Sequence, residues 1–363
     1  MSFFLNELED IRKVEEFFDN LFSSVKAKAD KILYEKYLKI RGKTSFTRRR
    51  SRKSLAKIRG YIIPGDVAAI SAVGVPIAPR IVANPAIEIS GDKARIYLRL
   101  ASIGSEFAKT FIAVADLRVE DLQGRIRVNA KPLLYGIMPY ECIEDPRIDP
   151  DVPGVLYHVR AFYRTKASRV FTFKSQIVGD KVDGIEAVRF YSRKWGEFLI
   201  QDYRDTFPVN RDFMTVRPFF KDKGFGIIAI GPREGALVNF DEIEILPELL
   251  PLNGEEKVGG NASLKISANE YLLLYHTVDK HGVYYTYSAL FDENAELLAL
   301  TREPIIAPEI GVYSGRRPST VFVCGAAIYG DFVFISAGVD DEIAVIYEIE
   351  KQKIYDSLKF LSS

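Results

Sequence analysis

The motif Glu144-Asp145-Pro146-Arg147 holds the densest group of charges in a stretch that is otherwise rich in apolar residues. Pro146 biases Asp145 toward an extended conformation, which can hold its carboxylate away from the local turn, as a catalytic acid requires. In an extended segment Arg147 projects to the same face as Asp145, where it can set the ionisation of that carboxyl or bind a substrate oxygen. An Asp-Pro turn closed by an ion pair between Asp145 and Arg147 explains the motif equally well. The catalytic and the structural interpretations therefore both stay open.

Several cationic side chains lie at or near the ends of predicted strands. His276 ends the apolar run that begins at Leu272, and a single histidine there favours a structural role over binding of phosphate or sugar hydroxyls. The arginines, each uninformative alone, are Arg99, Arg164, Arg204 and Arg217. If the fold brings these cations around the acidic motif, they suit an anionic co-substrate such as phosphate, or a sugar with many hydroxyl groups.

A second acidic group, Asp340-Asp341-Glu342, follows the last apolar strand and could add a carboxylate to the same site, although acids after a strand ordinarily form a turn. The sequence has no Walker-type glycine loop, no GxSxG elbow and no HExxH motif, which argues against nucleotide hydrolysis, triad chemistry and zincin chemistry. Two cysteines and three histidines leave little for a metal centre. We therefore expect chemistry based on carboxylates, arginines and hydroxyls, with no metal and no cofactor.

The elements that must position these residues are strands. Beyond Tyr61 the hydrophobic periodicity is two, and apolar runs alternate with Gly, Pro, Asp and Asn turns. In five successive cycles a short polar motif precedes a strongly apolar strand; the motifs are Asn84-Pro85-Ala86, Glu144-Asp145-Pro146-Arg147, Arg217-Pro218, Gly260-Asn261-Ala262-Ser263 and Cys324-Gly325-Ala326. Such cycles predict an all-β chain folded as a five-bladed β-propeller, whose channel would gather the motifs into one pocket. A two-layer sandwich explains the alternation but not the recurring motifs.

The N-terminal part differs in composition, and we expect residues 1–60 to form a helical and basic extension to a propeller domain over residues 61–363. Apolar residues from Leu5 to Val25 recur at helical spacing, which predicts an amphipathic helix. Residues 39–59 hold ten Lys or Arg and no acid, so the rest of the chain carries a formal charge of −9. A solvated linker, or a surface that docks on the protein's own acidic body or on a second subunit, explains this segment better than a nucleic-acid tether does.

The composition of the whole chain limits its class. With 363 residues, 47% of them hydrophobic, and 50 basic against 49 acidic residues, it is neither disordered nor surrounded by a global field that attracts nucleic acid or membrane. No window approaches the roughly 18 consecutive apolar residues of a membrane-spanning helix, and the acidic N-terminus lacks the pattern of a signal peptide. We expect a cytoplasmic protein with no membrane partner and no nucleic-acid partner.

In this order the five segments resemble glycoside hydrolase family 130, a family of five-bladed propellers that includes β-mannoside phosphorylases and β-1,2-mannosidases. The resemblance spans about residues 75 to 350. Its anchors are Asn84-Pro85-Ala86 with Arg99 downstream, Glu144-Asp145-Pro146-Arg147-Ile148, Arg217-Pro218, the run that ends at His276, and the segment that leads to Asp341.

The resemblance implies that Asp145 is the catalytic acid, which protonates the glycosidic oxygen directly or through a substrate hydroxyl. In the family's phosphorylases inorganic phosphate attacks the anomeric carbon from the opposite face, and in its hydrolases water does so, both with inversion. It also implies a set of residues that bind sugar or phosphate: Asn84, Arg99, Glu144, Arg147, Arg204, Arg217, His276 and Asp341. Some positions depart from the family pattern, because Arg204-Asp205 replaces a Lys-Asp pair and Val216-Arg217-Pro218 replaces His-Arg-Pro.

We expect inverting cleavage of β-mannoside-type bonds in an oligosaccharide, with phosphorolysis slightly preferred because the cation set is retained and no second carboxylate other than Asp340, Asp341 or Glu144 is an obvious base. The alternatives are an inverting β-mannosidase, a non-catalytic carbohydrate-binding propeller, and a nucleic-acid-associated scaffold led by residues 39–59. Helical extensions build oligomers in the family, so the N-terminal helix suggests a homo-oligomer.

Overall fold

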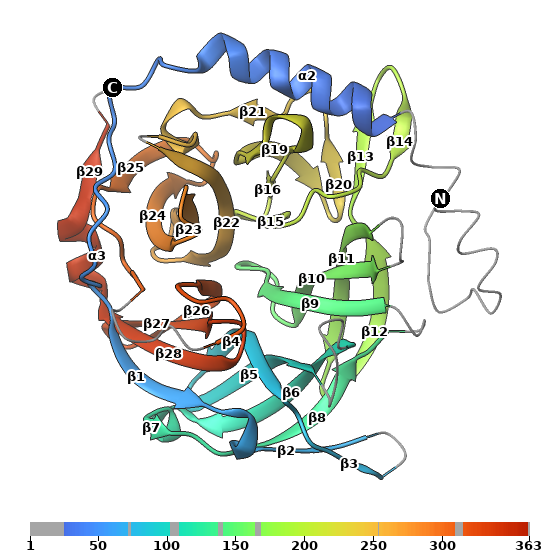
Figure 1. The fold of residues 1–363 in the computed structure, drawn as a ribbon, viewed down its shortest axis with the longest axis vertical. Helices are drawn as coiled ribbons and strands as arrows, with labels where there is room; N and C mark the ends of the chain where they lie inside the picture. The colour runs from blue at the N-terminus through green and yellow to red at the C-terminus, as the bar shows by residue number, and fades with distance from the viewer. Residues whose placement is uncertain are drawn as a thin grey trace.

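The computed structural model describes residues 25–71, 74–101, 109–136, 141–163, 168–252, 254–308 and 315–361. These residues form five sheets and two α-helices, which confirms the prediction of a mainly β chain (Figure 1). The helix predicted from Leu5 onward lies outside the described residues except at Val25, where the described helix α2 (Val25–Ile40) begins. Arg164 also lies outside them.

The first two sheets are mainly antiparallel and follow one another in the chain. The β4 sheet has the order β3-β2-β8-β6-β5-β4, with β2 (Val67–Ile70), β3 (Pro76–Ile77), β4 (Ile81–Ser90), β5 (Lys93–Ala101), β6 (Thr110–Arg118) and β8 (Val128–Leu134). The β9 sheet has the order β12-β11-β10-β9, with β9 (Glu141–Ile148), β10 (Val155–Tyr163), β11 (Ser168–Val178) and β12 (Lys181–Ala187).

The next two sheets contain the shorter strands. The β16 sheet consists of β13 (Arg189–Ser192), β14 (Gly196–Phe198), β15 (Phe207–Pro208), β16 (Phe213–Val216), β19 (Ala229–Glu234), β20 (Leu237–Asn239) and β21 (Glu244–Ile245). The β22 sheet consists of β17 (Phe219–Phe220), β18 (Phe225–Gly226), β22 (Glu255–Lys265), β23 (Glu270–Asp279), β24 (Tyr284–Asp292), β25 (Leu297–Thr301) and β29 (Leu358–Phe360).

The fifth sheet joins an early strand of the described chain to three late ones. The β26 sheet has the order β26-β27-β28-β1-β7, with β26 (Val321–Tyr329), β27 (Phe332–Val339), β28 (Ile343–Glu350), β1 (Lys57–Ile62) and β7 (Gly124–Arg125). The early strand β1 pairs antiparallel with the late strand β28, so hydrogen bonds hold the two ends together. The second helix, α3 (Lys351–Ser357), follows β28 directly.

The sheets lie side by side in chain order around a central region (Figure 1), and the hydrophobic core lies between neighbouring sheets. One cluster lies between the β4 and β9 sheets, and a larger one extends from the β9 sheet through the β16 and β22 sheets to α2. Two more clusters join the β22 sheet to the β26 sheet and the β26 sheet to the β4 sheet. Each sheet is therefore held mainly by burial of apolar area against its neighbours.

Four of the five polar motifs lie inside strands, at the same kind of irregularity. Strands β4, β9, β22 and β26 each carry one extra residue relative to their partner strand, at Asn84-Pro85, at Asp145-Pro146, at Asn261 and at Cys324. An extra residue of this kind is a β-bulge, which bends a strand and redirects side chains. These four strands contact one another in the middle of the molecule, so that the fold brings the bulges together as the sequence predicted.

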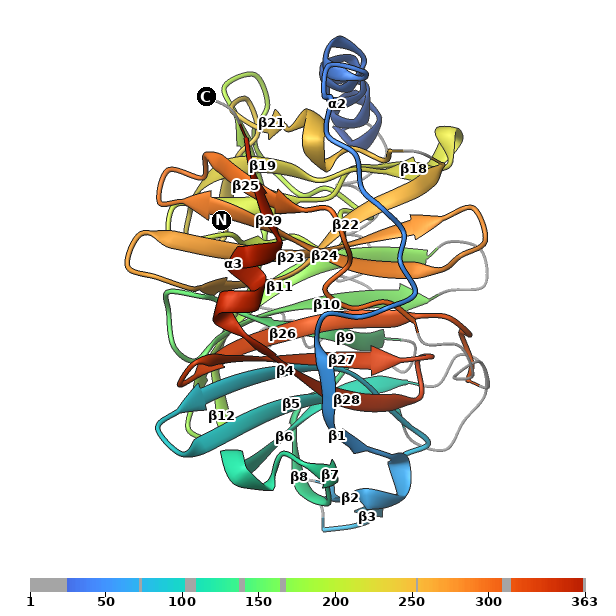
Figure 2. The same cartoon turned by 90° about the vertical axis from the view of Figure 1, so that its left-hand side faces the viewer.

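The basic segment between α2 and β1 runs along the outside of the sheets (Figure 2). The side chain of Arg48 is only 1% exposed; its Nη2 lies 2.6 Å from the Glu255 carboxylate, and its guanidinium packs over the ring of Tyr275. Arg50 and Arg59 pair with carboxylates at Asp279 and Glu348. The interpretation that this segment docks on the protein's own body is confirmed for these residues. Neither described helix is long and apolar enough to cross a membrane.

We predict that Arg48→Met lowers the free energy of unfolding by about 3–5 kcal/mol, because it leaves the buried Glu255 carboxylate without its cation. Urea unfolding measures this loss. Replacement of both partners, Arg48→Met with Glu255→Leu, should restore part of it. Arg52→Met changes the same side chain at an exposed position and serves as the control. Equal losses in Arg48→Met and Arg52→Met would contradict the buried ion pair.

Candidate active site

The backbone of β9 turns sharply at Asp145. Arg147 pairs with Tyr157 and Glu144 pairs with Val159, so that Asp145 and Pro146 together face the single residue His158. Asp145 has a φ of 52°, in the left-handed region that a non-glycine residue rarely adopts. The bulge breaks the two-residue alternation of the strand. The prediction that Arg147 shares a face with the Asp145 carboxylate is therefore wrong.

The Asp145 carboxylate is held by one oxygen and open at the other. Its Oδ1 accepts a hydrogen bond of 2.7 Å from Asn84 Nδ2 and one of 3.0 Å from Arg99 Nη1. No hydrogen bond from the described residues reaches its Oδ2, and the side chain is 11% exposed. The carboxylate is thus fixed in orientation while one oxygen is left for a ligand.

Asn84 is brought to Asp145 by the bulge in β4, where it has a φ of 44°. The turn brings Asn84 against Gly338 of β27, where a Cβ atom would lie 2.0 Å from Asn84 Oδ1. Position 338 therefore requires glycine, because a side chain would push Asn84 away from Asp145.

Glu144 and two arginines complete this side of the site. Arg99 Nη2 donates a 2.9 Å hydrogen bond to Glu144 Oε1 while its Nη1 contacts Asp145, so one guanidinium bridges both carboxylates. Arg204 Nη1 lies 3.7 Å from Glu144 Oε2. The fold thus brings five of the predicted site residues into one cluster: Asn84, Arg99, Glu144, Asp145 and Arg204.

Arg147 is buried, and its carboxylate partner is Asp205, not Asp145. It donates from Nη2 to Asp205 Oδ1, from Nε to the Asn261 carbonyl at 2.8 Å, and from Nη1 to the backbone carbonyl of Asp145 at 3.1 Å. Arg217 donates from Nη1 to the other oxygen of Asp205. Burial alone would raise the pKa of the Asp205 carboxyl, but Arg217 and Arg147 outweigh it and hold this pKa at about 2.

His276 is a buried, neutral hydrogen-bonding group. Asn261 Nδ2 donates to the Val323 carbonyl at 2.7 Å, which turns Asn261 Oδ1 toward His276 Nδ1 at 2.6 Å. Nδ1 therefore carries the proton, and Nε2, which no hydrogen bond from the described residues reaches, is an acceptor. Burial, with Arg217 and Arg147 nearby, lowers the pKa of His276 to about 3 against the opposite effect of Asp205.

A second glycine is required beside His276. A Cβ atom at Gly259 would lie 2.5 Å from His276 Cε1 and 2.9 Å from Asp205 Oδ2. Gly259 thus allows strand β22 to approach the buried charges, and it lies one residue before the motif that the sequence analysis identified at Gly260.

The fold adds two cations that sequence reasoning missed. Lys257 lies two residues before Gly259 on β22 and so projects to the same face, and its Nζ is 5.7 Å from the centre of the Phe219 ring. Burial lowers its pKa, and Arg217 and Arg317 lower it further. No ion pair involves Lys257 among the described residues. A lysine in a strand has no sequence signal that separates it from surface lysines.

The other missed cation is Arg317, which lies between β25 and β26. It donates a 2.8 Å hydrogen bond to the Tyr284 hydroxyl, and its Nη1 lies 3.7 Å from Asp341 Oδ2. The Tyr284 ring in turn lies 5.4 Å from the His276 ring. Asp341, a predicted site residue, is therefore linked to His276 through Arg317 and Tyr284.

The arrangement has two sides with different chemistry. On one side an open carboxylate oxygen of Asp145 lies in a network of Asn84, Arg99 and Glu144. On the other, Arg217 and Arg317 lie near enough to the neutral His276 and to Lys257 to lower the pKa of each, and this group of cations suits an oxyanion that also carries a proton. No group of three or more His, Cys, Asp or Glu in the described residues is placed to hold a metal ion.

Comparisons with known proteins show what this chain is similar to. Residues 242–360 match the family model of glycoside hydrolase family 130 that is described as beta-1,4-mannooligosaccharide phosphorylase. The chain is therefore a distant relative of that family, as the motifs predicted. The matched region contains His276 and Asp341, whereas Asp145 lies outside it.

Individual proteins are also similar to parts of the chain. A beta-1,2-mannobiose phosphorylase from Thermoanaerobacter sp. (strain X514) is 36% identical over 87 residues, which are 23% of this chain and 29% of that relative. A solved beta-1,2-mannobiose phosphorylase from Listeria innocua has a TM-score of 0.61 at 16% identity, over 84% of this chain and 96% of that one. A mannose phosphorylase from Leishmania mexicana, solved with phosphate ion, has a TM-score of 0.56 at 11% identity, over 85% and 92% of the two chains. At these identities the structures show a shared fold.

We predict that the buried histidines make stability fall in acid. His276 and His158 both have folded-state pKa values below their usual value, chiefly because of burial. As pH falls from about 6.5 toward 4, the unfolded chain binds a proton at each position and the folded chain does not. The free energy of unfolding therefore decreases with acid by up to about 1.4 kcal/mol per pH unit for each proton.

The slope of stability against pH tests this effect. His276→Gln and His158→Gln should each remove about one proton from the dependence measured by urea unfolding between pH 4 and pH 6. Slopes equal to that of the unchanged protein in both variants would show that these histidines are not neutral in the folded state.

Proposed function

We propose that this chain is a carbohydrate-active enzyme that cleaves β-mannoside-type bonds of an oligosaccharide with inversion, and that inorganic phosphate is the attacking group. The observation that carries the proposal is the Asp145 carboxylate, which is fixed through Oδ1 and open at Oδ2. In the proposed reaction Asp145 protonates the glycosidic oxygen from Oδ2, directly or through a substrate hydroxyl, as the bond to the anomeric carbon breaks.

We propose further that the five sheets are the blades of a β-propeller. The core clusters between successive sheets, and the pairing of β1 with β28, support this architecture. In such a fold the bulges of β4, β9, β22 and β26 would line the channel. The boundary between a basic extension over residues 1–60 and a domain over residues 61–363 belongs to the same proposal, with β1 crossing that boundary.

The cationic side supports phosphate as the nucleophile. Hydrogenphosphate has oxygens that accept from Arg217, Lys257 and Arg317 and a hydroxyl that can donate to His276 Nε2. Phosphate needs no catalytic base, because it arrives as an anion. Arg147, also proposed to bind substrate, would act in this scheme by holding Asp205 and Arg217 in place.

Hydrolysis is the second candidate function. Inversion by water needs a carboxylate that acts as a catalytic base. Glu144 is held by Arg99 and Arg204, and Asp340 is buried and accepts from the Thr320 amide. Asp341 is the more open carboxylate, with its side chain 19% exposed and 3.7 Å from Arg317. A hydrolase would therefore use Asp341. A carbohydrate-binding protein without activity is the third candidate.

Incubation with β-1,2-mannobiose, with and without inorganic phosphate, tests the proposal. We expect mannose 1-phosphate and mannose only when phosphate is present. Free mannose without phosphate would indicate the hydrolase, and binding without any product would indicate the carbohydrate-binding protein. The absence of a cofactor, a cytoplasmic location and a homo-oligomer formed through the N-terminal helix remain predictions.

The acid role of Asp145 predicts that Asp145→Asn keeps the fold and the binding of mannobiose but lowers turnover by about a hundredfold or more. The measurement is the initial rate of product formation. Asp183→Asn makes the same change at an exposed position of the β9 sheet and is the control. Unchanged turnover in Asp145→Asn would assign the acid elsewhere, and a loss of folding would favour a structural role.

If Lys257 binds phosphate on the cationic side, Lys257→Met should raise the KM for phosphate about tenfold or more. It should change the KM for mannobiose by less than about twofold. A hydrogen bond to a charged group is worth about 1.5–3 kcal/mol, which corresponds to such a factor. Lys265→Met, at the other end of β22, is the control. An equal rise of both KM values would mean that Lys257 shapes the whole pocket.

A further inference from the structure

The helix α2 lies against two separate segments that carry residues of the site. One is the turn from Asp202 to Asp205, and the other is the hairpin of β17 and β18 that follows Arg217. The first segment supplies Arg204 and Asp205, and the second directly follows Arg217. The helix itself supplies no residue to the cluster around Asp145.

The first segment is a strained turn. Asp202 and Asp205 have φ values of 64° and 55°, and such conformations persist only where the surroundings fix them. Tyr203, between them, is buried with its ring against Phe190, and its hydroxyl donates a 2.7 Å hydrogen bond to Asp30 Oδ1 of α2. Burial, with Asp30 beside it, raises the pKa of Tyr203 well above its usual range, so the hydroxyl keeps its proton.

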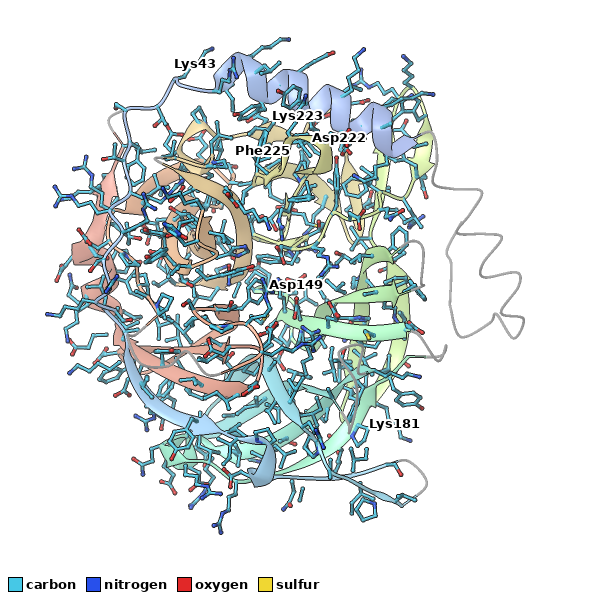
Figure 3. The ribbon with its side chains drawn as sticks, viewed as in Figure 1. Lys43, Asp149, Lys181, Asp222, Lys223 and Phe225 are labelled. Atoms are coloured by element: carbon cyan, nitrogen blue, oxygen red, sulfur yellow. The ribbon has the colours of Figure 1, made fainter. Side chains whose placement is uncertain are left out.

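The second segment is held by aromatic rings. Phe220 packs on Tyr34 at 5.4 Å between ring centres, and Phe225 packs on Tyr37 at 5.0 Å. Figure 3 shows Phe225 beside α2. Phe219, which precedes Phe220 in β17, projects away from the helix, toward the guanidinium of Arg217 and Nζ of Lys257. One face of this hairpin therefore contacts the helix, and the other contacts the cations of the site.

The helix is in turn fixed to the body. Lys36 Nζ donates to the Ile243 carbonyl at 2.6 Å, next to β21, and Ala29 and Leu33 are fully buried. Within the helix Lys26 pairs with the same Asp30 at 2.7 Å. The contact at Ile243 thus holds α2 at a point outside the two segments that carry site residues.

We propose that α2 is a positioning element of the site. Asp30 acts through Tyr203 on the turn that carries Arg204 and Asp205. Tyr34 and Tyr37 act through the β17–β18 hairpin on the adjacent Arg217. The inference rests on the proposed function for its kinetic consequence. Asp205 and Arg217 lie on the cationic side, whereas Arg204 lies beside Glu144 in the cluster around Asp145. Because the helix contacts both segments next to the paired Asp205 and Arg217, it controls binding of the anionic co-substrate more than the proton transfer at Asp145.

Tyr203→Phe tests the proposal, because it removes only the hydroxyl that reaches Asp30 and keeps the packed ring. We expect the KM for phosphate to rise about three- to tenfold while kcat at saturating phosphate and the KM for mannobiose stay within about twofold. Tyr191→Phe makes the same change at an exposed position of β13 and should alter nothing. Asp30→Asn, which keeps a weaker acceptor, should give a smaller shift in the same direction.

Hydrogen exchange of the backbone amides supplies a readout that does not depend on activity. We expect faster exchange at residues 202–206 in Tyr203→Phe than in Tyr191→Phe, because the strained turn has lost its contact with the helix. Unchanged exchange there, or an equal rise of both KM values, would overturn the proposal. If the unchanged protein shows no phosphate-dependent turnover, the proposed function fails and the exchange result alone decides the positioning role.

Discussion

The buried guanidinium group of Arg147 holds three segments of the chain in one geometry. It donates to the backbone of the bulge in β9, to the carbonyl of Asn261 in the bulge of β22, and to the Asp205 carboxylate in the turn before β15. A buried cation without a carboxylate is costly, and so is a buried carboxylate without a cation. Arg147 and Asp205 therefore have to stay together, and the strands that carry them are fixed with them.

From this contact hydrogen bonds continue from sheet to sheet. Asn261 donates to the Val323 carbonyl of β26, Ser336 of β27 donates to the Pro85 carbonyl of β4, and Asn84 of β4 donates to Asp145 of β9. Each link begins or ends at or next to a bulge. The left-handed residues Asn84, Asp145 and Asp205 are thus held within a network that links these sheets, and the Asp145 carboxylate is fixed by residues on strands.

The sequence predicted the strands and the motif residues, because period-two alternation and Pro or Asn at a bulge are local signals. It could not predict the partner of Arg147, because extended geometry places Arg147 beside Asp145 and only the bulge turns it toward Asp205. The roles of Asp205 and Lys257 in the site could not be predicted either. Their roles depend on contacts between sheets, which no local pattern contains, and the contacts of α2 with Tyr203 and Phe220 join residues far apart in the chain.

In the proposed reaction Asp145 and the cationic side act from opposite faces of one sugar ring, which requires inversion. The direct measurement is proton NMR of β-1,2-mannobiose during turnover in phosphate buffer, with the anomeric signal followed from the first minutes, before mutarotation or reversal. Inversion at a β-mannoside predicts that the first phosphorylated product is the α-anomer of mannose 1-phosphate. A β-configured first product would contradict it, because both groups would then have to act through a double displacement.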